Sequence, residues 1–290
     1  MRMKGIVLAG GTGSRLWPIT KGISKQLVPV YDKPLIHYPI GTLFLAGIRD
    51  ILIITTPEDQ SSFQRLLGNG SQYGANFEYA LQYKPNGLAE AFIIGEKFIS
   101  GENVALVLGD NIFHGAGLGK QLSRIDSQSG ATIFAYKVSN PESYGVVEFA
   151  LDGRVLSIEE KPIRPKSSFA IPGLYFYDNL VCEIAKTITP SERGELEISS
   201  INDHYLQEGQ LVVKILDRGT VWLDSGTIHM LHAASSYIQV IEERQGSKVS
   251  CLEEISWRNG WISDKELEIL ALEYGANPYG KYLSDLFENF

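Results

Sequence analysis

The chain has 290 residues, enough for one large domain or two small ones, and its balance of 44% hydrophobic and 21% charged residues is typical of a soluble globular protein. Its formal net charge of −8 argues against a nucleic acid or an anionic membrane as a partner, because both bind to a basic face. A local basic pocket is still compatible with this overall charge.

The cysteines and the start of the chain indicate a cellular compartment. Cys182 and Cys251 have neither Cys-x-x-Cys spacing nor a nearby histidine, so we expect no disulfide framework and no zinc site. The apolar stretch at residues 5–9 is too short for a signal peptide and leads into a glycine-rich turn. No run approaches the roughly 20 apolar residues of a membrane span. The sequence therefore predicts a cytoplasmic protein.

Short apolar runs alternate with helical patterns through the first half of the chain. The runs predict strands over residues 4–9, 50–56, 77–82 and 103–108. Apolar residues at helical spacing predict helices over residues 34–47, 60–67 and 89–98. Strands separated by helices indicate an α/β fold, with a mainly parallel sheet covered on both faces.

The middle of the chain has a different pattern. Strands are expected over residues 131–138, 145–149, 155–160 and 169–177, joined by tight turns. These strands indicate antiparallel additions to the same sheet, or a small subdomain. The remaining pattern predicts helices and two further strands: helices over 180–187 and 198–208, strands over 211–216 and 220–223, and helices over 228–243, 264–272 and 280–286.

A glycine-rich loop directly follows the first strand, with the sequence Gly10-Gly11-Thr12-Gly13-Ser14-Arg15. Ligands of open α/β sheets bind beyond the carboxyl ends of the strands, so the loop is well placed for a ligand. Glycines let backbone N–H groups approach a polyphosphate, and Arg15 offers a planar fork of donors. Lys25 lies ten residues further on and can reach the same anion. The alternative is a structural turn in which Arg15 is only a solvated side chain.

Two common phosphate-binding motifs do not fit this loop. A dinucleotide fingerprint needs a third glycine where Leu16 stands, and a P-loop needs Gly-Lys followed by Ser or Thr. Pro18, Pro29 and Pro34 show that the following segment is not one long helix. That favours an extended cover over a ligand.

Two aspartates, Asp110 and Asp224, each end an apolar strand and precede a glycine-containing loop. Mg²⁺ is commonly held by one or two carboxylates together with substrate phosphates and water, so this pair is a candidate magnesium site. The alternative is that each aspartate only forms a turn.

The middle of the chain adds a cation and polar groups. Lys161 follows a predicted strand and precedes a proline, so it can project into a cleft as a phosphate ligand, and Glu160 can accept hydrogen bonds from sugar hydroxyls. Gly173 can allow close approach of a substrate, with Tyr175 as a stacking surface. An ordinary charged hairpin and core packing of the aromatic residues are the alternatives. The charged run over residues 192–197 is interpreted as a solvated helix start.

Taken in order, these motifs resemble the sugar nucleotidyltransferases, and the resemblance covers nearly the whole chain. It rests on Gly10-Gly11-x-Gly13-x-Arg15-Leu16-x-Pro18, Lys25-Gln26-Leu27, Gly109-Asp110-Asn111, Glu160-Lys161-Pro162 and Trp222-Leu223-Asp224-x-Gly226-Thr227. The resemblance implies a Rossmann-like, three-layer α/β/α core over residues 1–244, with a mixed, mainly parallel sheet. Its nucleotide half would span about 1–130 and its sugar-phosphate half about 131–244. Residues 245–290 would form a helical extension packed on the core.

The resemblance also implies an activity and the residues that perform it. Glucose 1-phosphate would attack the α-phosphorus of dTTP and expel pyrophosphate, with Mg²⁺ as cofactor, in a homotetramer that binds no nucleic acid and no membrane. The catalytic residues would be Arg15, Lys25, Asp110 and Lys161, and the metal ligands Asp110 and Asp224. The nucleotide would contact Leu8, Gly10, Gly11, Thr12, Gly13, Ser14, Arg15, Gln26, Gln82 and Gly87. The sugar phosphate would contact Gly145, Glu160, Lys161 and Tyr175.

A second, regulatory nucleotide site is a further implication of the resemblance. It would lie near Gly115 and the segment containing Glu254, Ile255 and Arg258. Related enzymes often have a histidine soon after the Asp-Asn-Ile-Phe run, where this chain reads His114-Gly115-Ala116-Gly117. Ala116 puts the regulation in doubt and leaves the chemistry unaffected. Two alternatives to the leading activity are transfer with another nucleotide or sugar, such as UTP, and a nucleotide-sugar sensor without turnover.

Overall fold

The computed structural model describes residues 3–125 and 129–287. Within these residues one large mixed sheet contains β1 (Met3–Ala9), β4 (Asp50–Thr55), β5 (Asn76–Leu81), β6 (Asn103–Leu108), β8 (Ala131–Lys137), β9 (Gly145–Phe149), β10 (Val155–Glu160), β11 (Phe169–Ala170), β12 (Leu174–Tyr177) and β13 (Leu211–Ile215). The strand order is β10-β9-β11-β8-β12-β6-β1-β4-β5, and β13 pairs with β8. Two short antiparallel pairs join β7 (Asn111–His114) to β14 (Val221–Asp224) and β2 (Pro29–Val30) to β3 (Lys33–Pro34).

The central strand β1 explains why the sheet is buried on both faces. It pairs in parallel with β4 on one side and with β6 on the other. Successive side chains of a strand point to opposite faces, so Ile6 and Leu8 join one buried cluster while Val7 and Ala9 join the other. A strand whose residues 6–9 are all apolar and buried on both faces is typical of a sheet between two layers of helices.

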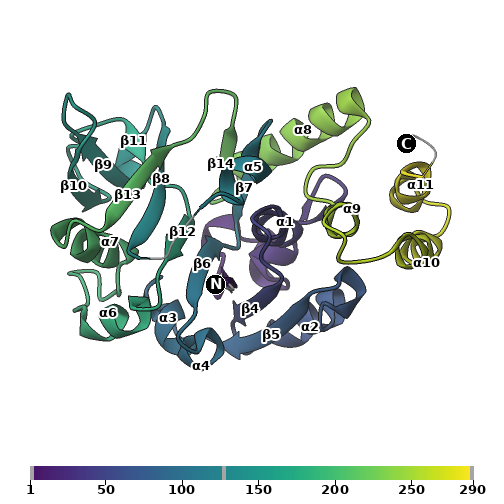
Figure 1. The fold of residues 1–290 in the computed structure, drawn as a ribbon, viewed down its shortest axis with the longest axis horizontal. Helices are drawn as coiled ribbons and strands as arrows, with labels where there is room; N and C mark the ends of the chain where they lie inside the picture. Colours follow the sequence, from purple (N-terminus) through teal and green to yellow (C-terminus); the bar gives the residue numbers. More distant parts are fainter. Residues whose placement is uncertain (1–2, 126–128, 288–290) are drawn as a thin grey trace.

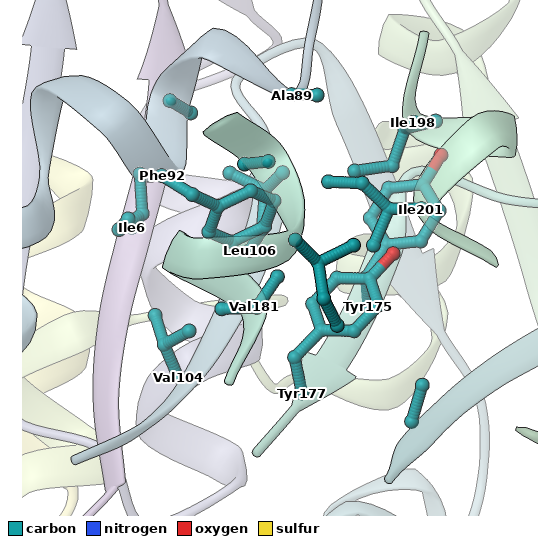
Figure 2. Close-up of a cluster of buried hydrophobic side chains, with 14 of the residues drawn as sticks. Ile6, Ala89, Phe92, Val104, Leu106, Tyr175, Tyr177, Val181, Ile198 and Ile201 are labelled. Atoms are coloured by element: carbon teal, nitrogen blue, oxygen red, sulfur yellow. The ribbon is translucent and has the colours of Figure 1, made fainter. Parts of the chain in front are cut away.

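Helices cover both faces, as Figure 1 shows for the whole chain. The first cluster is completed by α3 (Glu90–Ile94), α4 (Glu96–Ile99), α6 (Val181–Thr187) and α7 (Ile198–Gln207). The second is completed by α1 (His37–Leu45), α2 (Gln60–Leu67), α5 (Leu118–Leu122) and α9 (Leu252–Arg258). Figure 2 shows part of the first cluster, in which Phe92 and Ile201 approach the tyrosines of β12. The three-layer α/β/α fold with a mixed, mainly parallel sheet is therefore confirmed.

The last part of the chain is helical. The long helix α8 (Ile228–Gln245) leads to α9, α10 (Asp264–Tyr274) and α11 (Pro278–Asp285). These last three helices share a small apolar cluster that includes Cys251, Leu267 and Leu283. In Figure 1 they lie at the opposite end of the molecule from β9 and β10. Within the described residues no helix is both long and apolar enough to cross a membrane.

Several expected elements differ from those observed. The helix expected over 89–98 is two helices that meet at Gly95, and the strand expected over 169–177 is interrupted at residues 171–173, which contain Pro172. The helix expected over 34–47 starts at His37, because Lys33 and Pro34 form β3. Five strands and α-helices were not expected as such: β2, β3, β7, α5 and α9. The middle strands are antiparallel additions to the same sheet and do not form a separate small subdomain.

Candidate active site

Two adjoining cavities lie beyond the carboxyl ends of β1 and β6, with volumes of about 190 Å³ and about 260 Å³. Four residues line both cavities: Leu88, Leu108, Asp110 and Glu195. We call the smaller one the loop cavity, because the glycine-rich loop lines it, and the larger one the aspartate cavity, because both predicted metal ligands line it.

The loop cavity gathers most of the residues expected to bind a nucleotide. Six of them line it: Leu8, Gly10, Gly11, Gln26, Gln82 and Gly87. Thr12, Gly13 and Ser14 do not line either cavity, and Arg15 lines the aspartate cavity instead. Gly13 has a positive φ of 61°, and its carbonyl accepts a hydrogen bond of 2.7 Å from the Thr20 hydroxyl. This bond fixes the turn that directs Arg15.

The Gln82 side chain explains why glycine is needed at position 10. A Cβ at Gly10 would lie 2.3 Å from Gln82 Oε1, so any other residue would displace that amide. Gln82 Nε2 donates to Glu90 Oε2 over 2.8 Å, which holds the amide at the wall of the loop cavity. The glycine thus leaves room for a buried polar group that can face a bound base.

Gly87 lines the loop cavity and closely approaches the backbone of Leu196. Its φ of +113° is unfavourable for other residues, and a Cβ there would lie 2.3 Å from the carbonyl oxygen of Leu196. Leu196 N donates to Asn86 O over 2.6 Å, and Ala89 N donates back to Leu196 O over 3.1 Å. The segment before α7 is therefore fixed against the wall of the loop cavity.

The aspartate cavity gathers the residues expected to bind a sugar phosphate. Gly145, Glu160, Lys161 and Tyr175 all line it, together with Arg15, Asp110 and Asp224. Lys161 has a positive φ of 43°, and its N–H donates to the Tyr144 carbonyl over 3.0 Å, so the chain turns sharply at the end of β10. Burial raises the pKa of Glu160, although the nearby Lys161 ammonium opposes the shift.

Tyr175 is less available than the sequence indicates. Its side chain is only 3% exposed, and its ring stacks on that of Tyr177 with centroids 6.2 Å apart. Figure 2 shows both rings in the buried cluster. Most of Tyr175 therefore serves the core, and only part of it faces the cavity.

The two aspartates have contrasting environments. Lys25 Nζ lies 2.6 Å from Asp110 Oδ2, and Asn111 Nδ2 donates to Asp110 Oδ1 over 2.7 Å. Burial opposes ionisation of Asp110, but the charge and hydrogen bonds of these partners hold its pKa below the ordinary value. Asp224 has a pKa raised to about 6, first by burial and then by the negative charge of Asp110.

This pair of carboxylates fits a magnesium ion. The mutual repulsion that raises the pKa of Asp224 would be relieved by a divalent cation between the two side chains. Within the described residues no group of three or more His, Cys, Asp or Glu side chains could hold a metal alone. Mg²⁺ often takes only one or two carboxylates and completes its shell with phosphates and water, so the site suits a metal that arrives with a substrate.

Comparison with known proteins agrees with this geometry. A family model described as "Nucleotidyl transferase" matches residues 4–240. The glucose-1-phosphate thymidylyltransferase of Neisseria meningitidis serogroup A is 58% identical over 99% of this chain and 100% of its own length. That of Mycobacterium tuberculosis strain H37Rv is 57% identical over 99% of each chain. The chain belongs to the nucleotidyl transferase family.

Solved structures of similar proteins support the fold of this nucleotidyl transferase. A Bacillus anthracis protein, described as a glucose-1-phosphate thymidylyltransferase and crystallised in complex with sucrose, superimposes with a TM-score of 0.75. It is 40% identical, over 81% of this chain and 94% of that one. A UDP-glucose pyrophosphorylase complexed with UDP-glucose superimposes with a TM-score of 0.73 at 23% identity, over 83% and 100% of the two chains. The latter shows the likeness of the fold alone.

The interpretation of residues 192–197 as a solvated helix start was wrong. Arg193, Glu195 and Glu197 of this nucleotidyl transferase line the aspartate cavity, and Glu197 is buried. Arg193 Nη2 lies 2.9 Å from a carboxylate oxygen of each of the two glutamates. The charged run lies in the cavity because Leu196 pairs with the 86–89 segment, a long-range contact that charge pattern alone does not reveal.

A third cavity of about 330 Å³ brings together the residues expected at a second nucleotide site. Gly115, Glu254, Ile255 and Arg258 all line it, along with Lys248 and His114. Arg258 Nε lies 2.7 Å from Glu254 Oε1. Ala116 is exposed and does not line this cavity.

Proposed function

We propose that this protein transfers the dTMP group of dTTP to glucose 1-phosphate, giving dTDP-glucose and pyrophosphate, as the first step toward dTDP-linked deoxysugars. The observation that carries this proposal is the junction of the two cavities at Asp110, with Arg15 and Asp224 beside it. The full-length identity of 57–58% to proteins named for this reaction supports the choice of substrates.

The reaction joins two anions. A phosphate oxygen of glucose 1-phosphate forms a bond to the α-phosphorus of dTTP, and the bond from that phosphorus to the oxygen bridging it to the β-phosphate breaks. The electron pair leaves with pyrophosphate. No general base is needed, since the attacking phosphate is already ionised at neutral pH. The barrier therefore arises mainly from charge repulsion and alignment, which fixed cations and a rigid site reduce.

The side chains of the two cavities can meet these requirements. Arg15 lines the aspartate cavity, where its guanidinium can neutralise the triphosphate and the leaving group. Lys161 projects from the turn after β10 and can bind the sugar phosphate, while Glu160 and the Gly145 backbone can hold the sugar hydroxyls. Lys25 acts on the substrates indirectly, because its ammonium is paired with the Asp110 carboxylate.

Asp110 and Asp224 would hold Mg²⁺. When bound, the ion would neutralise phosphate charge and so favour attack at the α-phosphorus. Asn111 and Lys25 keep the Asp110 carboxylate ionised and oriented for that role. The half-buried Asp224 side chain supplies the second carboxylate.

The decisive experiment measures pyrophosphate release. The protein is incubated with Mg²⁺, with dTTP or UTP, and with glucose 1-phosphate or another sugar 1-phosphate. We expect the fastest release with dTTP and glucose 1-phosphate. Faster release with a different pair would reassign the substrates within the family. Calorimetric binding of dTTP without any release would instead favour a nucleotide-sugar sensor.

We further propose a cytoplasmic homotetramer with a regulatory nucleotide in the third cavity. Lys248 and Arg258 supply positive charge to that cavity, while the exposed Ala116 supplies no contact. Light scattering should give four times the mass of the 32.1 kDa chain. Titration of dTDP-rhamnose into the assay should lower the rate, and Arg258→Ala should weaken that inhibition. A monomeric mass, or equal inhibition of both proteins, would contradict these two proposals.

A further inference from the structure

Trp222 is an uncharged residue in the wall of the aspartate cavity. It belongs to β14, two residues before Asp224, and pairs with Phe113 of β7. The side chain is 8% exposed and lines the aspartate cavity. Its indole N–H donates to Asn111 Oδ1 over 2.6 Å. A buried tryptophan needs such a partner, so this bond fixes the ring in one orientation.

The same bond determines which way the Asn111 amide points. Asn111 Oδ1 accepts from Trp222 Nε1 and, over 3.1 Å, from Gly173 N, while Asn111 Nδ2 donates to Asp110 Oδ1 over 2.7 Å. If the Asn111 amide were rotated by half a turn, its NH₂ group would face the N–H donors of Trp222 and Gly173. Its oxygen would then face the Asp110 carboxylate. Two fixed donors therefore hold the NH₂ group on Asp110.

The indole ring also contacts a residue beside the sugar-phosphate part of the cavity. The Trp222 ring lies 5.0 Å from the Tyr144 ring, with an angle of 62° between the planes. The Tyr144 carbonyl accepts from Lys161 N over 3.0 Å, and Gly145 follows directly. The Trp222 side chain thus contacts both Asn111, which binds Asp110, and Tyr144, which binds the Lys161 backbone.

We infer that Trp222 is a positioning residue, which aligns the metal carboxylate Asp110 with the sugar-phosphate residues through the Asn111 amide and the Tyr144 ring. The inference deepens the proposed function and rests on it. Groups that orient metal ligands typically contribute 10–100-fold to metal affinity or activity, so the loss of this link should be measurable without loss of the fold.

The test replaces Trp222 by phenylalanine, which keeps an aromatic ring and removes the N–H donor. The matched control is Trp257→Phe, because Trp257 Nε1 donates to Asp264 Oδ1 over 2.7 Å far from both cavities. Binding of Mn²⁺ in the presence of dTTP is followed by electron paramagnetic resonance. We expect W222F to weaken Mn²⁺ binding by about tenfold and to lower kcat by about 10–100-fold. W257F should match the wild type.

Two further readouts separate positioning from a general loss of structure. Calorimetric binding of dTTP without metal should be unchanged in W222F, because Trp222 does not line the loop cavity. In an Asn111→Ala background, W222F should change Mn²⁺ affinity by no more than about twofold, since the link is already broken. Circular dichroism checks that each variant is folded. If W222F does not fold, N111A alone must show the Mn²⁺ defect.

The inference is overturned if folded W222F binds Mn²⁺ as tightly as W257F, or if the two substitutions weaken binding additively. It is equally overturned if folded N111A binds Mn²⁺ like the wild type. The Mn²⁺ measurements need no glucose 1-phosphate and no turnover. A wild-type protein that binds Mn²⁺ with dTTP but releases no pyrophosphate would therefore disprove the proposed function without deciding the role of Trp222.

Discussion

At the scale of single residues, the two aspartates of the site differ in how their charge is compensated. Asp110 has the Lys25 ammonium at 2.6 Å, whereas Asp224 is half-buried, and desolvation and the charge of Asp110 raise its pKa to about 6. The protein therefore stabilises the ionised form of Asp110, whereas it disfavours the ionised form of Asp224. A bound cation would stabilise the second one most, which links metal binding to the charge state of Asp224.

Asp110→Asn and Asp224→Asn should lower the activity to a similar extent but should affect the stability of the protein differently. Each variant removes one metal-binding charge, so pyrophosphate release should fall by about 10²–10³-fold. Without metal, D224N should be as stable as the wild type or more so, because it removes a disfavoured half-buried charge. D110N leaves the buried Lys25 ammonium without its carboxylate and should lower the free energy of unfolding by up to about 3 kcal/mol.

Urea unfolding in EDTA and the pyrophosphate assay check both parts of this expectation. Asp152→Asn is the control, because Asp152 is exposed and pairs with Arg154 in the turn between β9 and β10. Near-normal rates in D110N and D224N over a range of Mg²⁺ concentrations would refute the metal assignment. Equal losses of stability in the two variants would refute the contrast between their environments.

At the scale of elements, the close approach of Gly87 to the Leu196 backbone fixes one wall of the loop cavity. Gly87→Ala would place a methyl group 2.3 Å from a backbone oxygen at a φ of +113°, so the 86–89 segment must shift. We expect the KM for dTTP to rise about tenfold or more, with stability lower by about 1–3 kcal/mol. The control is Gly101→Ala, which has a positive φ of 75° but open space at its Cβ.

Kinetics with varied dTTP and thermal unfolding measure this effect. G101A should lose about 1 kcal/mol of stability through its backbone conformation alone and keep the wild-type KM. A normal KM in G87A would show that the loop cavity tolerates movement of the 86–89 segment.

Elements with an uninterrupted local pattern were predictable from the sequence. The bounds of β6 and α2 match the expected 103–108 and 60–67. A run of apolar residues and a helical period can each be recognised in the sequence without knowledge of the tertiary structure. Residues 171–173 interrupt an apolar run because Gly173 must pass Leu108 and Asn111, where a Cβ would lie 2.5 Å and 2.9 Å from them. Such a close approach depends on the fold.

The candidate site was predictable where one local motif supplied a residue. The glycine loop, the strand-end aspartates and Lys161 line the two cavities, with Thr12, Gly13 and Ser14 as exceptions. Arg193 was missed because its position depends on long-range pairing of the chain. Trp222 was missed because its role depends on one hydrogen bond to Asn111. Charge and periodicity contain neither kind of information.

At the scale of the whole molecule, a buried histidine couples stability to pH. His37 begins α1, and burial lowers its pKa to about 4; Lys33 adds to this shift, while Glu253 and Asp32 oppose it. In the unfolded chain an ordinary pKa of 6.5 applies, so the unfolded state binds the extra proton between pH 6.5 and 4. This contribution is full above pH 6.5 and is lost as the pH falls through about 4.

Replacing His37 by phenylalanine should therefore flatten the acid limb of the stability curve. The wild type should lose about 3 kcal/mol more than H37F between pH 7 and pH 4. Urea unfolding at intervals of half a pH unit measures the slope. His204→Phe removes an exposed histidine and should keep the wild-type slope. Parallel curves for the wild type and H37F would contradict the assignment.

A group of four charged residues, of which Lys33 and Glu242 are buried, links the last region of the chain to the core. Glu242 of α8 lies 3.0 Å from Lys33 Nζ and 3.2 Å from Lys248 Nζ, and its Oε1 accepts from Val249 N over 2.9 Å. Asp32 pairs with both lysines from the other side. The group joins the β2–β3 hairpin, the end of α8 and the chain that leads into α9.

Removing the central carboxylate should loosen this junction. In Glu242→Ala, Lys33 and Lys248 share the single carboxylate of Asp32, and the Val249 N–H loses its acceptor. The free energy of unfolding should therefore fall by about 3–5 kcal/mol. Glu243→Ala is the matched control, since Glu243 is exposed one residue further along α8. In urea E242A should unfold at a much lower midpoint and E243A near that of the wild type. If the two midpoints coincide, hydrophobic packing of α9 on α1, and not this charge group, holds the C-terminal helices on the core.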